Sequence, residues 1–142
     1  VVGAVIDRCS WDGVRRLPMS VRSGAERGPF PAKFSQATIA GNLVFVSGQA
    51  GIDFETGKID ADFGKQARHA FENLKRVLEA SGSDLAHTTK VVVWLKRPED
   101  FETLNALYQE YFPETPPARS VPVVDLPKPE YLISVEAIAI LK

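Results

Sequence analysis

The last strand-like run of the chain, residues 131–141, is apolar on both of its faces, and this restricts the folds open to the chain. Successive side chains of a β-strand point to opposite faces of a sheet. One face of the run carries Leu132, Ile138 and Ile140, and the other carries Ile133, Val135, Ala137, Ala139 and Leu141. Both faces of the sheet therefore need an apolar cover.

Two β-rich runs, residues 34–40 and 43–47, flank the dipeptide Gly41-Asn42. Both residues of that dipeptide tolerate a positive φ, so the sequence predicts a β-hairpin. Residues 47–51 follow with two glycines beside a strand. Glycines at such a place let the backbone approach a ligand or another strand, and a simple bulge or strand end is the equal alternative.

Helical periodicity appears twice in the middle of the chain. Asp60 is predicted to cap a helix that carries apolar residues at 3.6-residue spacing and ends at Ser81-Gly82. Residues 88–95 then form a strand, and the unbroken apolar run at residues 91–95 indicates burial on both faces. Pro98 opens a second helix, which has on one side Phe101, Leu104, Tyr108 and Tyr111.

These elements follow one another in the order β-β-α-β-α-β-β, which predicts an α+β fold of one domain with two helices on one face of a mixed sheet. We assign this domain to residues 20–142 and expect residues 1–19 to be a flexible N-terminal extension. Because two helices can cover only one face, the second apolar face of the last strand predicts a homo-oligomer. Its sites are then expected between subunits.

Composition excludes several classes of function. The net charge is −1 and the chain has no run of Lys or Arg, so nucleic acid is disfavoured as a partner. No apolar run reaches the ~18 residues needed to span a bilayer. One cysteine, Cys9, rules out an intrachain disulfide and indicates a reducing, cytoplasmic setting.

Known cofactor and metal patterns are also missing from the sequence. Two histidines and one cysteine do not make an ordinary zinc site, so we expect no metal. The chain has no GxGxxG, Walker or CxxC spacing and no apparent Ser/His/Asp or Cys/His arrangement. We therefore expect chemistry that uses no cofactor.

Two charged residues stand inside strand-like runs: Arg119 in residues 118–124 and Glu136 in residues 131–141. A charge in apolar surroundings is costly unless it is paired or has a function. One interpretation is a structural ion pair between them that closes a subunit interface. In the other, Arg119 binds a substrate carboxylate through its planar donors and Glu136 holds a water, both facing one small pocket.

Several short motifs together resemble the RidA/YjgF family of reactive-intermediate deaminases. In chain order they are Phe34-Ser-Gln-Ala, Val46-Ser-Gly-Gln, Asn105 with Tyr108, Pro117-Ala-Arg-Ser, Leu126-Pro-Lys and Val135-Glu-Ala-Ile-Ala. The resemblance covers roughly residues 20–142 and implies a chorismate-mutase-like fold, a homotrimer and three clefts between subunits. It also implies hydrolysis of 2-imino acids or their enamine tautomers, products of pyridoxal-phosphate enzymes, to 2-keto acids and ammonia without cofactor or metal. That role is a form of metabolite damage control.

Site residues follow from the resemblance by position. Arg119 corresponds to the arginine that binds the substrate carboxylate, and Glu136 to the glutamate that orients the attacking water. Ser47 and Gly48 correspond to the stretch that lines the pocket. We add Asn105 as a substrate-binding residue, with the alternative that it only packs or solvates the second helix.

Two departures from the family pattern affect the expected pocket. Phe34 stands where many members have tyrosine, so a contact made by that hydroxyl is lost. Val121 stands where many have cysteine, so thiol reactivity is absent, although the backbone at Val121 can still face the substrate. Carboxylate binding through Arg119 is unaffected by either departure.

Three competing functions stay open. The first is a trimer that binds small carboxylates or acts as a holdase without turnover. The second is an endoribonuclease, which the missing basic stripe and the missing pair of histidines disfavour. The third is a specialised deaminase for an intermediate of ring cleavage or pyrimidine catabolism, with the same residues acting on a larger substrate.

Overall fold

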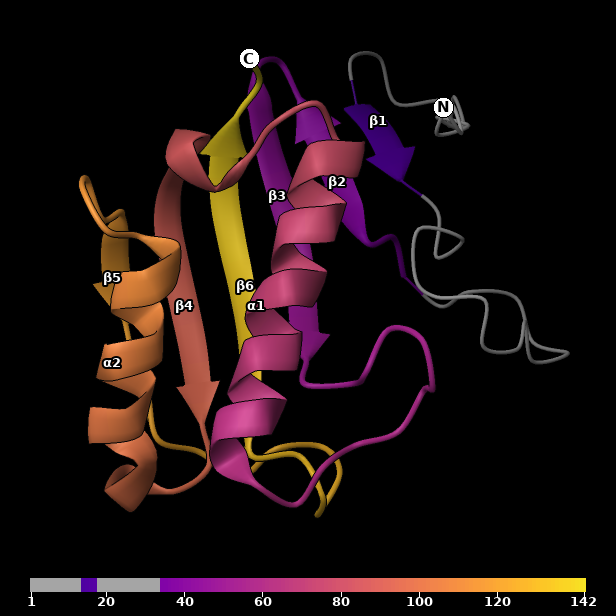
Figure 1. Ribbon diagram of the computed structural model, residues 1–142. Helices are drawn as coiled ribbons and strands as arrows, with labels where there is room; N and C mark the ends of the chain where they lie inside the picture. The colour runs from indigo at the N-terminus through magenta and orange to yellow at the C-terminus, as the bar shows by residue number, and fades with distance from the viewer. Residues whose placement is uncertain (1–13, 18–33) are drawn as a thin grey trace, which may run out of the picture.

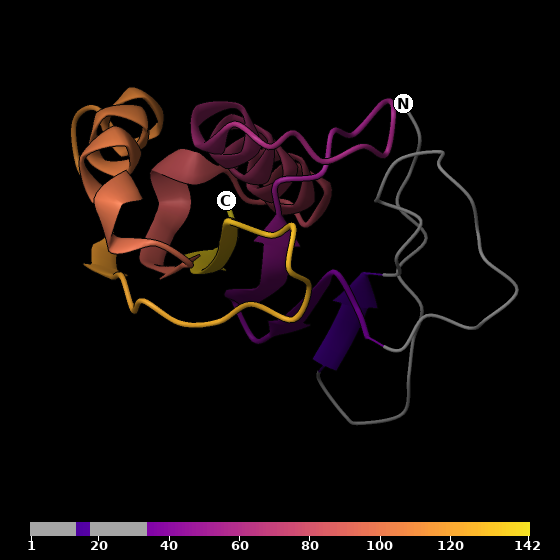
Figure 2. The ribbon, with the colours of Figure 1, turned by 90° about the horizontal axis from the view of Figure 1, so that it is seen from below.

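The computed structural model describes residues 14–17 and 34–142 and contains one six-stranded sheet in the order β1-β2-β3-β6-β4-β5 (Figure 1). The strands are β1 (Val14–Leu17), β2 (Ala37–Ala40), β3 (Leu43–Ala50), β4 (Thr88–Leu95), β5 (Ala118–Ser120) and β6 (Ile133–Ile140). β4 and β5 are parallel and the other pairs are antiparallel. The helices α1 (Phe63–Ala80) and α2 (Phe101–Tyr111) lie on the same face of the sheet (Figure 2). The predicted α+β fold is confirmed.

The N-terminal edge of the sheet contains one strand that the sequence did not predict. β2 and β3 form the expected hairpin, and Gly41 has a φ of 60° at its turn. β1 pairs antiparallel with β2, within the segment expected to be a flexible extension. The edge of β2 offered unpaired backbone groups, which β1 satisfies. The predicted boundary between residues 19 and 20 lies outside the described residues.

The N-cap of helix α1 lies two residues later than predicted. Asp62, not Asp60, is its N-cap, and the Asp62 carboxylate accepts a hydrogen bond of 2.9 Å from the backbone N–H of Lys65. Asp60 instead accepts from the N–H of Asp62 at 2.8 Å and so shapes the turn before the helix. The predicted end is confirmed, because Ser81 is the C-cap and Gly82 follows with a φ of 86°.

Helix α2 is preceded by a 3₁₀ turn, η3 (Pro98–Asp100), so the predicted start at Pro98 marks this turn and the α-helix begins at Phe101. The helix packs on α1 through aromatic rings. Phe71 of α1 stacks on Tyr111 with ring centroids 5.0 Å apart and meets Tyr108 edge-on at 5.9 Å. These contacts fix α2 over the β4–β5 edge of the sheet (Figure 1).

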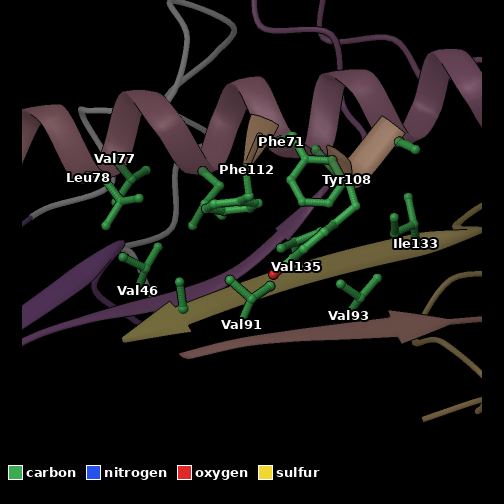
Figure 3. Close-up of a cluster of buried hydrophobic side chains, with 14 of the residues drawn as sticks. Val46, Phe71, Val77, Leu78, Val91, Val93, Tyr108, Phe112, Ile133 and Val135 are labelled. Carbon is green, nitrogen blue, oxygen red and sulfur yellow. The ribbon is translucent and has the colours of Figure 1, made fainter. Parts of the chain in front are cut away.

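The core lies between the two helices and the sheet (Figure 3). On the helix side, every second residue of β6 is buried. Buried side chains of α1, β4 and α2 complete the layer, and its fully buried members include Phe71, Leu74, Leu78, Leu95, Leu104 and Ile133. Burial of this layer, at about 25 cal/mol per Å² of apolar surface, is the main source of stability.

The opposite face of the sheet, which we call the open face, is apolar but only partly covered. Phe45 and Leu43 remain 39% and 37% exposed. In β4, Val91, Val93 and Leu95 are buried whereas Val92 and Trp94 are half-buried, so the expected burial of this strand on both faces is wrong for a single chain. The reason is that both helices lie on one side. Cover by a second copy stays a prediction.

Candidate functional site

Arg119 is held over the outermost strand of the sheet by side chains of α2. Its Nη1 donates a hydrogen bond of 2.9 Å to Oδ1 of Asn105. The guanidinium carbon lies 4.7 Å from the ring centroid of Tyr108 and 5.8 Å from that of Phe101. Asn105 and Tyr108 are three positions apart and so share one side of the helix. The arginine is therefore half-buried in a fixed orientation and does not extend into bulk solvent.

Donor groups of Arg119 stay available in this arrangement. A guanidinium has five N–H donors, and hydrogen bonding to Asn105 uses one of them. None of the ion pairs among residues 34–142 includes Arg119. A half-buried guanidinium with open donors is suited to bind a planar carboxylate through two parallel hydrogen bonds.

Tyr108 supports Arg119 as a neutral ring. Burial raises the pKa of the Tyr108 phenol to about 12, although the nearby Arg119 guanidinium acts in the opposite direction. The hydroxyl points from α2 toward the sheet (Figure 3) and finds no hydrogen-bond partner among the described residues. The ring thus gives the guanidinium an electron-rich face without adding a charge.

Glu136 lies on β6 and points to the open face. One carboxylate oxygen, Oε2, accepts a hydrogen bond of 3.2 Å from the indole Nε1 of Trp94 on β4. Lys90 of β4 stands on the same face, but its Nζ donates to Oγ of Ser120 at 2.8 Å. Within the part of the chain that the structure describes, no ion pair neutralises Glu136.

Strand register places Arg119 and Glu136 on opposite faces of the sheet. Glu136 is paired with Val92, and Val91 is paired with Arg119. Because consecutive residues of β4 point in opposite directions, the two charges do so as well. Arg119 and Glu136 therefore do not face a common pocket within one chain, since β4 separates β5 from β6, and they form no ion pair among the described residues. A pocket or an ion pair that joins them across a subunit interface stays a prediction.

Ser47 and Gly48 lie far from Arg119 in the same chain. Their strand, β3, is three strand positions from β5, which is about 14 Å at ~4.8 Å per spacing. Oγ of Ser47 donates to the carbonyl of Ser35 at 2.6 Å. A Cβ on Gly48 would lie 2.8 Å from Oγ of Ser134 on β6, beside a bulge between Val46 and Gln49. The absence of a side chain at Gly48 therefore allows β6 to lie close to β3, which is one of the predicted alternatives.

The two positions that depart from the family pattern occupy different places. Phe34 is 48% exposed at the start of the continuous described segment, before β2. Val121 follows β5 and is half-buried against the hydrophobic core. One chain thus divides the predicted residues into two groups. Arg119, Asn105 and Val121 belong to the α2–β5 edge, whereas Glu136, Ser47 and Gly48 belong to β6 and β3.

Sequence reasoning missed Trp94. It was assigned only to an apolar run, residues 88–95, and its indole N–H was given no partner. A signal was present, because a buried tryptophan combines a large apolar body with an indole N–H that needs a hydrogen-bond acceptor. Its partner follows only from the β4–β6 register, which the sequence does not give.

A surface groove of about 480 Å³ separates the first half of α1 from α2, but it holds none of the predicted site residues. Its lining includes Lys65, His69 and Leu107, and the ion pair between Arg68 and Glu110 belongs to it. Among the described residues no group of His, Cys, Asp and Glu side chains is arranged to hold a metal ion. None of the helices in those residues combines the length and apolarity needed to cross a membrane.

Comparison with known proteins gives consistent matches over most of the chain. The family model described as Endoribonuclease L-PSP matches residues 28–141. A RutC family protein of Pyrococcus abyssi is 46% identical over 117 residues, which are 80% of this chain and 91% of that protein. The 2-iminobutanoate/2-iminopropanoate deaminase of Escherichia coli K12 is 40% identical over 111 residues, 75% of this chain and 86% of that protein.

Solved structures agree with these matches. The crystal structure of E. coli TdcF with bound serine superimposes with a TM-score of 0.74 at 34% sequence identity. The similarity covers 86% of this chain and 95% of that chain. The similarity therefore extends over nearly all of the fold described above.

Proposed function

The chain belongs to the YjgF/RidA family, which includes the L-PSP proteins, and from this premise we propose that it is a hydrolytic deaminase of 2-imino acids and their enamine tautomers. The products are 2-keto acids and ammonia, and neither a metal nor an organic cofactor takes part. The substrates are the unstable imines and enamines that pyridoxal-phosphate enzymes release. The E. coli relative named 2-iminobutanoate/2-iminopropanoate deaminase supports small substrates with two to three carbons beyond the carboxylate.

The observation that carries the proposal is the state of Arg119. Its guanidinium is half-buried, held by Asn105 and Tyr108, and unpaired with any carboxylate of the described residues. Such a group is costly to keep for packing alone, because desolvation of the charge is not compensated by an ion pair. A 2-imino acid carries a carboxylate next to the reacting carbon. Binding of this carboxylate to Arg119 orients the imine for attack.

Completion of the site requires a second copy of the chain. Arg119 and Glu136 point to opposite faces of the sheet in one chain. The α2–β5 edge with Arg119 and the open face with Glu136 can therefore meet only when they belong to different copies. The open face, with Phe45 and Leu43 more than one-third exposed, is apolar enough to pack against that edge. We propose a homotrimer, in which each interface combines the two halves.

The proposed reaction adds one water across the C=N bond. Glu136 takes a proton from the water while the water oxygen bonds to the imine carbon, and the C=N electron pair moves to nitrogen. Glu136 gives this proton to the nitrogen, which yields a neutral carbinolamine. Glu136 then takes the hydroxyl proton and passes it to the amino nitrogen, the C–N bond breaks with its electron pair on nitrogen, the C=O bond forms, and ammonia leaves. Glu136 ends in its starting state, so the reaction consumes only the imine and water.

The catalytic demand on such a site is small, because imines of 2-keto acids already hydrolyse in water. An acceleration of roughly tenfold to a thousandfold needs only about 1.4–4 kcal/mol of transition-state stabilisation. Fixing the carboxylate and aiming one water is enough to supply this amount. A site with few residues is therefore adequate.

Two other functions are weighed against this proposal. The family model carries the description Endoribonuclease L-PSP, yet His87 already contacts Asp84, with 2.7 Å between Nδ1 and Oδ1. His69 stands on a different element, near the start of α1, so a pair of histidines for acid–base cleavage of RNA is lacking in the described residues. A non-catalytic carboxylate-binding or holdase trimer uses the same Arg119 and differs only in lacking turnover. A specialised catabolic deaminase differs only in its substrate.

A coupled assay separates these functions. An amino-acid oxidase or a serine/threonine dehydratase generates the imine, and the release of 2-keto acid is followed with and without the protein. We expect faster release with the wild type, no acceleration with Arg119→Ala, and full acceleration with Arg68→Ala as the matched control. Arg68 is exposed and pairs only with Glu110.

The outcomes of this design separate the alternatives. Absence of acceleration by the wild type rejects the deaminase function toward small 2-imino acids and leaves the binding trimer and the specialised deaminase. Equal acceleration by Arg119→Ala rejects the carboxylate anchor. RNA cleavage that co-purifies with the protein and disappears with Arg119→Ala or Glu136→Ala establishes the ribonuclease instead.

A further inference from the structure

Trp94 is the one side chain of the described residues that hydrogen-bonds to the carboxylate of Glu136. Its Nε1 lies 3.2 Å from Oε2 of Glu136. Trp94 is opposite Ser134 in the β4–β6 pairing, and Glu136 is opposite Val92, so the two residues are diagonal neighbours on the open face. Both are half-buried.

The contact leaves the rest of the Glu136 carboxylate unoccupied. In residues 34–142 the other oxygen, Oε1, accepts no hydrogen bond. Lys90, on the same face of β4, is engaged with Ser120 instead. An indole N–H is a donor only and carries no charge. It therefore fixes one oxygen without neutralising the carboxylate, as an ammonium or guanidinium would.

Fixing one oxygen also fixes the direction of the other. The final torsion of a glutamate side chain is broad, so a free carboxylate turns over a wide range. Trp94 has only two side-chain torsions and stands on a central strand between β6 and β5. With Oε2 held by this rigid donor, Oε1 points in one direction on the open face. A single oriented acceptor is what a bound water needs.

We propose that Trp94 is a positioning residue for Glu136: its indole N–H holds Oε2 so that Oε1 receives and aims the attacking water. The inference rests on the proposed deaminase function. Trp94 itself touches neither water nor the reacting atoms in this role. Its removal therefore lowers the rate of the chemical step while leaving the binding of the substrate carboxylate to Arg119 unchanged.

The kinetic test compares Trp94→Phe in two backgrounds. Phenylalanine keeps an aromatic ring on β4 and removes the N–H. In the wild-type background we expect kcat to fall about tenfold, with KM unchanged within about twofold. In the Glu136→Ala background the same substitution has no further effect beyond about twofold. An equal fall in both backgrounds assigns Trp94 a merely structural role and overturns the proposal, as does an unchanged kcat.

A second readout does not depend on turnover. The chain has two tryptophans, Trp11 and Trp94, so Trp11→Phe leaves one indole N–H resonance in a ¹H–¹⁵N spectrum. We expect Glu136→Ala to shift that resonance and the control Glu102→Ala, on exposed α2 surface, to leave it in place. We also expect 2-ketobutyrate to shift the resonance in the Trp11→Phe protein that retains Glu136. An indole signal insensitive to both Glu136→Ala and 2-ketobutyrate overturns the proposal.

The two readouts distinguish failure of this inference from failure of the proposed function. A wild type without deaminase activity rejects the function, and with it the positioning role, even when the indole resonance responds to Glu136→Ala. An active wild type whose Trp94→Phe variant is equally active retains the function and rejects only the role of Trp94.

Discussion

Arg119 and Glu136 lie on opposite faces of one sheet, with β4 between the strands that carry them. This relationship prevents the two residues from acting on one small molecule within a single chain. It also explains why each has its own support, Asn105 and Tyr108 for the arginine and Trp94 for the glutamate. Each chain therefore carries two half-sites, one around Arg119 and one around Glu136.

Removal of the Asn105 side-chain amide is expected to weaken substrate binding. Its Oδ1 accepts the hydrogen bond that orients Arg119, so Asn105→Ala frees the guanidinium to adopt other rotamers. We expect KM for the imine to rise about tenfold with a smaller change in kcat, because the lost contact acts in ground state and transition state alike. Steady-state kinetics in the coupled assay measure both constants.

The matched control for Asn105 is Gln109→Ala, an exposed position on the same helix. It is expected to leave both constants unchanged. Asn105→Asp gives a second test, since a carboxylate at this position pairs with Arg119 and competes with the substrate. A KM for Asn105→Ala equal to that of the wild type contradicts the role given to Asn105.

Tyr108 is expected to make stability depend on alkaline pH. Its pKa is about 12 in the native chain and about 10 in the unfolded chain. Between these values the unfolded chain has released the proton and the native chain still holds it, so the free energy of unfolding falls as pH rises from about 10 to 12. The contribution of Tyr108 to this loss reaches about 2–3 kcal/mol, and this contribution is absent in Tyr108→Phe.

Urea unfolding at a fixed protein concentration, repeated from pH 7 to 11.5, measures this effect. Tyr111, whose pKa burial also raises to about 12, is unchanged in Tyr108→Phe, so a smaller alkaline decline remains. At pH 7 the substitution removes a buried hydroxyl without a partner in the described residues, and we expect no loss of stability. Identical pH dependence for the two proteins contradicts the burial of this phenol.

Gly48 and Gly51 are expected to reject a side chain to different degrees. A Cβ at Gly48 meets Oγ of Ser134 at 2.8 Å, whereas one at Gly51 meets the backbone of Gln66 on α1. A serine hydroxyl can turn away and a helix backbone cannot. We expect Gly48→Ala to cost about 1–2 kcal/mol and Gly51→Ala more.

The double variant Gly48→Ala with Ser134→Ala tests the assigned contact. Loss of the serine Oγ makes room for the new methyl group, so stability is expected to return most of the way to that of Ser134→Ala alone. Chemical denaturation compares the four proteins. If the Gly48→Ala cost is the same with and without Ser134, the close approach of β3 and β6 is not its cause.

Local features of the fold were predictable from the sequence. The Gly41-Asn42 hairpin, the apolar stripe of α1 and its end at Gly82 each depend on residues close together in the chain. The cap was misplaced at Asp60 because two aspartates stand two residues apart and both suit a helix start. Asp62 is the residue that accepts a hydrogen bond from the N–H of Lys65. Only the path of the preceding loop decides which of the two aspartates caps the helix.

Candidate residues for the site could be selected from the sequence, but their arrangement could not. Arg119 and Glu136 were identified as charges inside apolar runs, but which face each one takes depends on the β4–β5 and β4–β6 registers. Register is set by contacts between distant segments, and a shift by one residue reverses every face. For the same reason the partner of Trp94 could not be read from residues 88–95.

Subunit mixing tests the division of the site most directly. Arg119→Ala chains, which give no acceleration, and Glu136→Ala chains, which keep only a low residual rate, carry different tags and are unfolded and refolded together. If every interface of a trimer joins an Arg119 half of one copy to a Glu136 half of the next, about one interface in four receives both native residues by chance. Selection for both tags removes the trimers of a single chain type, and one interface in three of the remaining trimers then has both native residues, so doubly tagged oligomers should regain about a third of wild-type deaminase activity. Doubly tagged oligomers no more active than the two parent proteins would contradict the account.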